Sequence, residues 1–158
     1  MKIEFRVVGK TNEAYLKEGI EIYHRRIGHY LPYAMEVLPD IKQAGKLSPE
    51  QLKDQEGKMI LQKINPDDCL ILLDEKGKTF SSVQFAGFLS KLLQQSYKRI
   101  IFQVGGAFGF SQEVYQRANS QLSLSDMTFS HQMIRLFFTE QLYRAMTILR
   151  NEKYHNEG

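Results

Sequence analysis

Two runs of apolar residues constrain the fold of this chain more than any other feature. Residues 69–73 (CLILL) are continuously apolar, and residues 99–104 (RIIFQV), which are apolar except for Arg99 and Gln103, form a second buried run that ends at Gly105-Gly106. An unbroken run of this length is typical of a strand that is covered on both faces. Such strands occur chiefly in parallel sheets with helices on both sides, so the sequence predicts an α/β protein.

The rest of the chain alternates between strand and helix patterns. Further strands are predicted at 2–8, 35–38 and near Leu122. Capping residues and apolar positions three or four apart predict helices at 12–29, from Ser48, from Ser81, from Ser111, and from about 131 to 150. We therefore expect a single α/β domain over residues 1–158 with a largely parallel sheet, and a flexible loop at 40–46.

The composition sets limits on location and partners. The chain has 158 residues, a net charge of +3 and one cysteine, Cys69. A lone cysteine excludes an internal disulfide and fits a cytoplasmic protein, and its place in an apolar run predicts a buried, inert thiol. The sequence has neither a run of about 18 apolar residues nor the start of a signal peptide, so we expect no membrane contact. The mild charge permits RNA as a partner without requiring it.

Three segments with polar residues or glycines follow predicted strands. They are residues 73–78 (LDEKGK), 105–109 (GGAFG) and 122–129 (LSLSDMTF). Ligands of open α/β sheets bind beyond the carboxyl ends of the strands, and glycines let the main chain approach a ligand closely. The glycine segment matches neither the dinucleotide fingerprint nor the phosphate-binding loop, and ordinary turns explain each segment alone. Together, the three segments predict one shared pocket.

The C-terminal part carries further candidates for chemistry, namely His131, Arg135, Arg144, Tyr154 and His155. Each has a structural alternative. Arg144 follows Glu140 by four residues, so the two side chains can pair along one helix face. His131 can simply belong to the start of that helix, and a terminal tail such as 154–155 is commonly frayed. These alternatives stay open from the residues alone.

No pattern for a metal site or a nucleophile is found. The four histidines lack zinc-ligand spacing. The adjacent acidic pairs 67–68 and 74–75 would point to opposite faces of a strand, which argues against a carboxylate dyad. The G-x-S-x-G pattern of serine hydrolases is absent as well. We therefore expect chemistry that needs no metal.

Several groups of residues, read in order along the chain, form a specific combined pattern. They are Gly9, Leu73-Asp74 before Gly77-Lys78, Gly105-Gly106 with Gly109, 124–131 (LSDMTFSH), Arg135, Glu140-Gln141, Tyr143-Arg144-Ala145 and Tyr154-His155. In order and spacing, this pattern resembles that of the ribosomal large-subunit methyltransferase H family, which belongs to the SPOUT methyltransferases. The resemblance covers essentially the whole chain.

The resemblance implies both a fold and an activity. The implied fold is a SPOUT-type α/β knot, with a largely parallel sheet flanked by helices and a C-terminal trefoil knot, although general fold rules argue against knots. The implied protein is a homodimer that uses S-adenosyl-L-methionine as methyl donor, without a metal. Its implied target is N3 of a pseudouridine in 23S ribosomal RNA, methylated on the assembled ribosome.

The resemblance also assigns residues by position. Those implied at the cofactor are Leu73, Gly105, Gly106, Leu124, Ser125, Asp126, Met127, Thr128 and Phe129. Those implied as catalytic residues facing the substrate are His131, Arg135, Arg144, Tyr154 and His155, with the tail of one subunit completing the site of the other. The chain departs from the family pattern at three places. Ser130 replaces the usual proline, which we expect to loosen that loop. Residues 107–108 are bulkier than in relatives, and residues 156–158 extend the usual ending.

A mechanism follows from these assignments. The imide N–H must lose its proton, so a cation such as Arg144 or Arg135 would stabilise the anion, and His155 or a water molecule would accept the proton. Lys10, Lys17, Arg25 and Arg26 are candidate phosphate contacts, although a solvated helix face explains them equally well.

Two alternatives from other classes remain. One is a non-catalytic ribosome-binding or RNA-binding protein of the same fold, which would not bind the cofactor. The other is a flavodoxin-type nucleotide-binding domain, which would prefer a mononucleotide or dinucleotide to S-adenosylmethionine.

Overall fold

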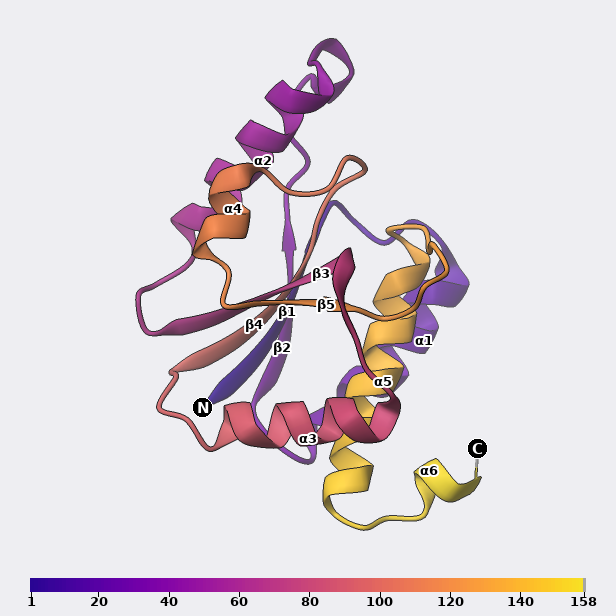
Figure 1. Cartoon of the computed structure of the whole chain (residues 1–158). Coiled ribbons are helices and arrows are strands. Elements are labelled where there is room, and N and C mark those ends of the chain that lie inside the picture. The colour runs from indigo at the N-terminus through magenta and orange to yellow at the C-terminus, as the bar shows by residue number, and fades with distance from the viewer. Residues whose placement is uncertain (158) are drawn as a thin grey trace.

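The computed structural model describes residues 1–157 and is built on one five-stranded sheet (Figure 1). The strands are β1 (Lys2–Val8), β2 (Tyr33–Leu38), β3 (Asp68–Thr79), β4 (Arg99–Val104) and β5 (Ser120–Ser123). Their order is β2-β1-β4-β3-β5, and every pairing between neighbours is parallel. The predicted parallel α/β sheet is therefore confirmed. Because the strands share one direction, all their carboxyl ends meet at the same edge.

The helices cover both faces of the sheet. One layer contains α1 (Ala14–Gly28), α3 (Ser82–Leu93) and α5 (Met133–Leu149), and the other contains α2 (Pro49–Gln62) and α4 (Gln112–Arg117) (Figure 1). The short helix α6 (Tyr154–Glu157) packs back on α5. Among the helices of residues 1–157, none is both long and apolar enough to cross a membrane.

Two helices begin with the capping pattern expected from the sequence. The Ser48 hydroxyl accepts a hydrogen bond from the Gln51 amide at 3.2 Å, and the Gln51 side chain accepts one from the Ser48 amide at 2.9 Å. Ser81 and Gln84 repeat this arrangement at the start of α3. Each box satisfies amide groups that have no partner within the helix, so it fixes where the helix starts.

The two faces of the sheet are packed differently. On the α1–α3–α5 face, β1 contributes alternate apolar residues, and the Phe5 ring lies 4.6 Å from that of Phe138, which lies 4.8 Å from Phe102. On the α2–α4 face, the intervening residues of β1 include Glu4 and Arg6, which are also buried. The alternation of charged and apolar residues in β1 therefore reflects two buried faces, one apolar and one ionic.

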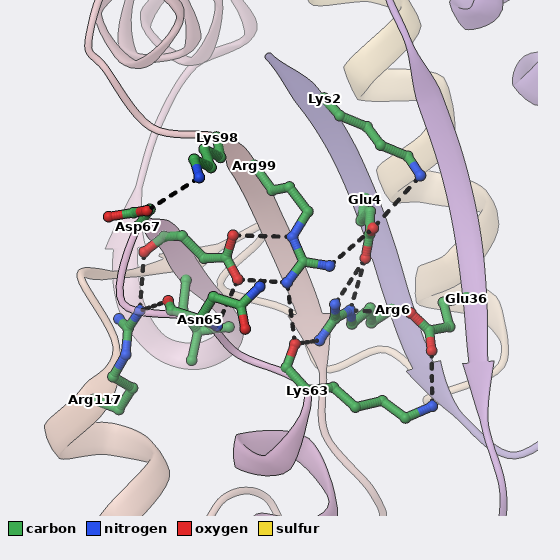
Figure 2. A network of polar contacts seen from close by, with 12 residues as sticks. Lys2, Glu4, Arg6, Glu36, Lys63, Asn65, Asp67, Lys98, Arg99 and Arg117 are labelled. Carbon is green, nitrogen blue, oxygen red and sulfur yellow. Dashed lines mark hydrogen bonds and ion pairs between the residues drawn. The ribbon is translucent and has the colours of Figure 1, made fainter.

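The ionic face holds a connected network at the amino ends of β1, β3 and β4 (Figure 2). Arg99 donates to both carboxylate oxygens of Asp68, at 2.9 and 2.5 Å. Arg6 donates to Glu4 at 3.0 Å, and both guanidinium groups also donate to the Lys63 carbonyl, just past α2. The network thus fastens the end of α2 to the sheet.

One expectation from the sequence needs correction. β3 does not end at residue 73 but continues to Thr79, with residues 74–77 bulging out of the pairing with β5. The segment 40–46 is a loop, as expected, with a 3₁₀ turn over Ala44–Lys46, and its flexibility stays a prediction. The C-terminal knot stays a prediction, as does the single domain, whose last residue, 158, lies outside the described residues.

Candidate functional site: a glycine-lined pocket at the carboxyl edge

The three segments that were expected to share a site do surround one pocket of about 350 Å³. Its lining comes from the ends of β3, β4 and β5 and from the start of α5, namely Leu73, Asp74, Glu75, Val104, Gly105, Gly106, Ala107, Gly109, Ser123, Leu124, Ser125, Met127, Thr128, Phe129, Ser130, His131 and Ile134. Of the residues implied at the cofactor, Asp126 is not part of this lining. The structure therefore brings the other eight together, and their role in binding stays a prediction.

The glycine segment forms the tightest wall of this pocket. Gly109 has a φ of +87°, which favours glycine, and its amide donates to the Gly106 carbonyl at 3.2 Å. A Cβ on Gly106 would lie 2.3 Å from the carboxylate of Glu56, so any side chain there forces a rearrangement. Of the bulkier pair at 107–108, Ala107 lines the pocket, whereas Phe108 is 52% exposed and does not.

The segment after β5 is held by its own hydroxyl groups. The Ser125 hydroxyl accepts from the Met127 amide at 2.9 Å, and Thr128 reaches the carboxylate of Glu75 at 3.4 Å. The Ser130 hydroxyl accepts from the Met133 amide at 3.0 Å. The Ser130 hydroxyl therefore closes the turn that leads into α5, and the loosening expected from the missing proline stays a prediction.

Arg135 is fully buried and is not exposed to the pocket. Its guanidinium donates to the carbonyls of Gly9 at 2.8 Å, Val8 at 2.9 Å and His131 at 3.1 Å, and to the Thr11 hydroxyl at 3.1 Å. Burial lowers the pKa of this guanidinium. These contacts tie the loop after β1 to the start of α5, so the geometry favours a positioning role over the predicted contact with substrate.

The remaining candidates form a second group at the far end of α5. Arg144 donates to the Glu140 carboxylate at 2.9 and 3.2 Å, and Tyr154 donates to the same oxygen at 2.9 Å. A ring nitrogen of His155 lies 3.1 Å from the Arg144 guanidinium, and the Tyr154 ring lies 4.7 Å from it. The expected ion pair along the helix is thus present, and the alternative of a frayed tail is wrong.

The two groups are separated within one chain. Arg144 lies ten residues beyond Ile134, which lines the pocket, and ten residues of helix span about 15 Å. Of the five predicted catalytic residues, His131 borders the pocket and Arg135 lies behind its wall. Arg144 lies farther along α5, and Tyr154 and His155 belong to α6, which packs on α5. The structure of one chain therefore does not bring the candidate site together.

Three acidic residues lie near the pocket, and one of them, Glu56, was not expected from the sequence. Asp74 and Glu75, which belong to the predicted segment 73–78, line the pocket, and Asp74 accepts a hydrogen bond from the Tyr115 hydroxyl. Glu56 is 7% exposed, and its Oε1 atom has no hydrogen-bond partner. Burial, with a smaller contribution from Asp40, raises the pKa of the Glu56 carboxyl group.

Other reactive groups do not form a further centre. Burial raises the pKa of the Cys69 thiol to about 11, in keeping with the inert thiol that was predicted. Within residues 1–157, no three histidine, cysteine or acidic side chains lie close enough together to hold a metal ion.

A parallel α/β domain with a glycine-lined pocket at its carboxyl edge is suited to binding a small organic ligand. A family model described as "Predicted SPOUT methyltransferase" matches residues 1–155. The chain therefore belongs to the SPOUT methyltransferase family, which decides against the flavodoxin-type alternative.

Individual proteins agree with this assignment. A protein of Parabacteroides distasonis called "Ribosomal RNA large subunit methyltransferase H" is 55% identical over 157 residues, which cover 99% of this chain and all of the relative. A protein of the same name from Christiangramia forsetii is 50% identical over 156 residues, 99% of each chain. A probable methylase family protein from Haemophilus influenzae superposes with a TM-score of 0.51 over 94% of this chain and 66% of its own, at 12% identity, which supports the fold alone.

Proposed function

We propose that this chain transfers a methyl group from S-adenosyl-L-methionine to N3 of a pseudouridine in 23S ribosomal RNA. In this proposal the protein acts in the cytoplasm, as a homodimer, on the assembled ribosome. The observation that carries the proposal is the pocket lined by the segments after β3, β4 and β5. The name shared by relatives that match over their full length supports the substrate.

The pocket has features that fit this methyl donor. Glycines at 105 and 106 leave main-chain groups accessible to a ligand, and Leu73, Leu124 and Ile134 supply apolar surface for a planar ring. Glu75 offers a carboxylate to hydroxyl or amino groups. When bound, S-adenosylmethionine supplies an electrophilic methyl group, and the task of the protein is then to align the acceptor nitrogen with it.

Arg144 is the residue we assign to the anion that forms when the imide loses its proton. Its guanidinium is only partly exposed, which strengthens its interaction with a negative charge. Because an arginine N–H can only donate, the neighbouring His155 Nδ1 is an acceptor in this arrangement. His155 can therefore take the proton at Nδ1 only after Arg144 has moved off it, and a water molecule is the simpler acceptor.

A homodimer would resolve the distance between the pocket and Arg144. Apolar side chains are exposed near the contact between α1 and α5, where Tyr15 is 59%, Ile22 39% and Phe137 44% exposed. Large exposed apolar residues that lie close together are typical of an interface. In a dimer across this surface, the Arg144 group of one subunit can approach the pocket of the other. Sedimentation at micromolar concentration should therefore give twice the monomer mass.

The decisive experiment measures methyl transfer from labelled S-adenosylmethionine to ribosomes from a strain that lacks this gene. Free large subunits serve as the comparison. Incorporation on whole ribosomes, mapped to N3 of one pseudouridine, would support the proposal. A folded dimer that methylates neither substrate and does not bind the cofactor would instead favour the non-catalytic RNA-binding alternative.

Variants of the Arg144 group test the mechanism in the same assay. We expect Arg144→Ala to lower kcat by roughly 100-fold or more while cofactor affinity stays unchanged. Arg150→Ala is the matched control, because Arg150 carries the same charge just past the end of α5 and its guanidinium lies over the Tyr30 ring, outside the Arg144 group. Wild-type turnover in His155→Ala would remove His155 from the mechanism and leave water as the proton acceptor.

A further inference from the structure

A second cavity, of about 1010 Å³, lies beside the cofactor pocket. It is bounded by the loop after β1, the end of β2, α1 and the start of α5. Of the described residues, His131 alone lines both cavities. The second cavity is therefore adjacent to the pocket, and the two meet at His131.

The floor of this cavity is apolar and its rim is cationic. Ile20, Met35 and Leu38 line the floor. Lys10 and Lys17 line the rim, and neither forms an ion pair with any carboxylate of residues 1–157. Apolar side chains together with unpaired ammonium groups suit a nucleotide, whose base needs an apolar surface and whose phosphate needs a cation.

The four cations that were candidate phosphate contacts thus separate into two pairs. Lys10 and Lys17 border the cavity with free charges. Arg25 is instead 3.4 Å from Glu21 in an ion pair, and Arg26 stacks over the rings of Tyr23 and Tyr143. The pairing of Arg25 also offsets Glu21, one of the two acidic residues that line the cavity.

Polar groups capable of recognising a base also line the cavity. His24 borders it, and its Nε2 atom is buried without a hydrogen-bond partner. The carboxylate of Asp40 is the other acidic group in the lining. The loop wall is held in place, because the Gln132 side chain accepts from the Asn12 amide at 2.9 Å and donates to the Lys10 carbonyl at 3.1 Å.

We propose that this cavity binds a nucleotide of the RNA substrate that neighbours the target base, with its phosphate on Lys10 and Lys17. The inference rests on the proposed function, since it assumes an RNA substrate. A flanking nucleotide fits better than the target itself, because methyl transfer requires direct contact with the donor and the second cavity shares only His131 with the cofactor pocket. The cavity then sets which RNA segment is accepted.

The first test is kinetic and uses Lys17→Glu in the full-length protein. We expect the KM for ribosomes to rise about tenfold, with kcat within a factor of two and an unchanged dissociation constant for S-adenosylmethionine. Lys98→Glu is the matched control, because Lys98 carries the same charge on the opposite edge of the sheet. Equal increases in KM for both variants, or none for Lys17→Glu, would overturn the proposal.

The second test needs no methyl transfer, so it remains informative if the proposed function fails. The chain has six methionines, of which Met35 lines the second cavity and Met127 lines the cofactor pocket. In protein labelled with ¹³C at the methionine methyl groups, each of the four nucleoside monophosphates is added separately. At least one should shift the Met35 signal, whereas S-adenosylhomocysteine should shift that of Met127.

Two variants complete the nuclear magnetic resonance experiment. Met35→Leu assigns the signal, and Lys17→Glu should weaken the nucleotide-induced shift. The second cavity is not a nucleotide site if none of the four nucleotides shifts the Met35 signal, or if they shift the Met127 signal alone. The two proposals can also fail separately. If the wild-type protein shows the Met35 shift but does not methylate ribosomes, the result counts against the proposed reaction and not against the nucleotide site.

Discussion

Buried charged side chains are paired at one edge of the sheet and lack an ion-pair partner at the other. At the amino edge, Arg99 meets Asp68 and Arg6 meets Glu4, so each buried charge touches an opposite one (Figure 2). At the carboxyl edge, the buried Arg135 contacts carbonyls and a hydroxyl but forms no ion pair within residues 1–157. Glu56 is buried there with one oxygen unpartnered. The amino edge is thus complete in itself, whereas the carboxyl edge has unused capacity for interaction.

This difference has a cost in stability. A buried polar group without a partner costs roughly 1–3 kcal/mol, which a domain tolerates only when it is compensated elsewhere. The paired network at the amino edge holds β1, β3, β4 and the end of α2 together, and it leaves the opposite edge free to carry open loops. We therefore predict that substitutions at the amino edge affect stability, whereas substitutions at the carboxyl edge affect ligand binding.

The largest expected effect is at the carboxyl edge. In Gly106→Val, the new side chain collides with the carboxylate of the buried Glu56, so either Glu56 or the glycine loop must shift, and we expect cofactor binding to be lost. Calorimetric titration with S-adenosylmethionine measures this loss. The control is Gly87→Val in α3, because an added Cβ there has no neighbour within 4 Å. Unchanged affinity in Gly106→Val would show that the cofactor binds elsewhere.

The next effect concerns the amino edge. Asp68→Asn should lower the free energy of unfolding by about 3 kcal/mol, because it leaves Arg99 without its bidentate partner. The neighbouring Asp67→Asn should cost less than about 0.5 kcal/mol, since its pair with Lys98 is exposed. Urea denaturation gives both values. Loss of cofactor affinity in folded Asp68→Asn would mean that the two edges are coupled.

The same network predicts how stability depends on acid. Burial alone would raise the pKa of Glu4 and Asp68, but the guanidinium groups of Arg6 and Arg99 lower both overall. A carboxyl group whose pKa is lower in the folded state than in the unfolded state stabilises the folded protein when the pH is above its unfolded-state pKa. This contribution is lost as the pH falls through its folded-state pKa. Wild-type stability should therefore fall below about pH 4, and Asp68→Asn should reduce this dependence.

A third effect should appear at the loop after β1. Arg135→Lys keeps the charge but cannot reach all of the Val8, Gly9 and His131 carbonyls at once, so we expect a loss of about 2 kcal/mol in unfolding free energy. A positioning role further predicts a higher KM for ribosomes with kcat largely retained. A fall in kcat alone would instead support the predicted direct contact with substrate.

Local patterns in the sequence predicted most of the secondary structure. The apolar runs of β3 and β4 and the serines before α2 and α3 each act over a few residues, so their physical cause is visible in the sequence. The same reasoning placed the three loops of the pocket at one edge. It stopped β3 too early, because the polar residues 74–79 gave no apolar signal for the pairing with β5.

The site depends on contacts that local patterns do not encode. Arg135 binds the carbonyl of Gly9, 126 residues away in the chain, so no spacing could reveal its burial. The family resemblance named Arg144 and His155, but one chain leaves them far from the pocket. Glu56 did carry a signal, because it lies midway between Leu52 and Ile60 on one stripe of α2, where a charge is unexpected.

The smallest expected effect concerns a single carboxyl group at the carboxyl edge, that of Glu56. Because burial raises the pKa of Glu56, its folded form favours the proton, and stability is lost as pH rises from about 4.5 through the folded pKa. Glu56→Gln should therefore stabilise the protein at pH 7 by on the order of 1 kcal/mol and have little effect at pH 4.

The control is Glu50→Gln, because Glu50 forms an exposed ion pair with Lys53 on the same helix, and this variant should show no gain in stability. The sign is opposite to that of Asp68→Asn, since one carboxylate lacks the partner that the other has. Destabilisation by Glu56→Gln at pH 7 would mean that the ionised group is paired in solution, and the contrast between the edges would then fail.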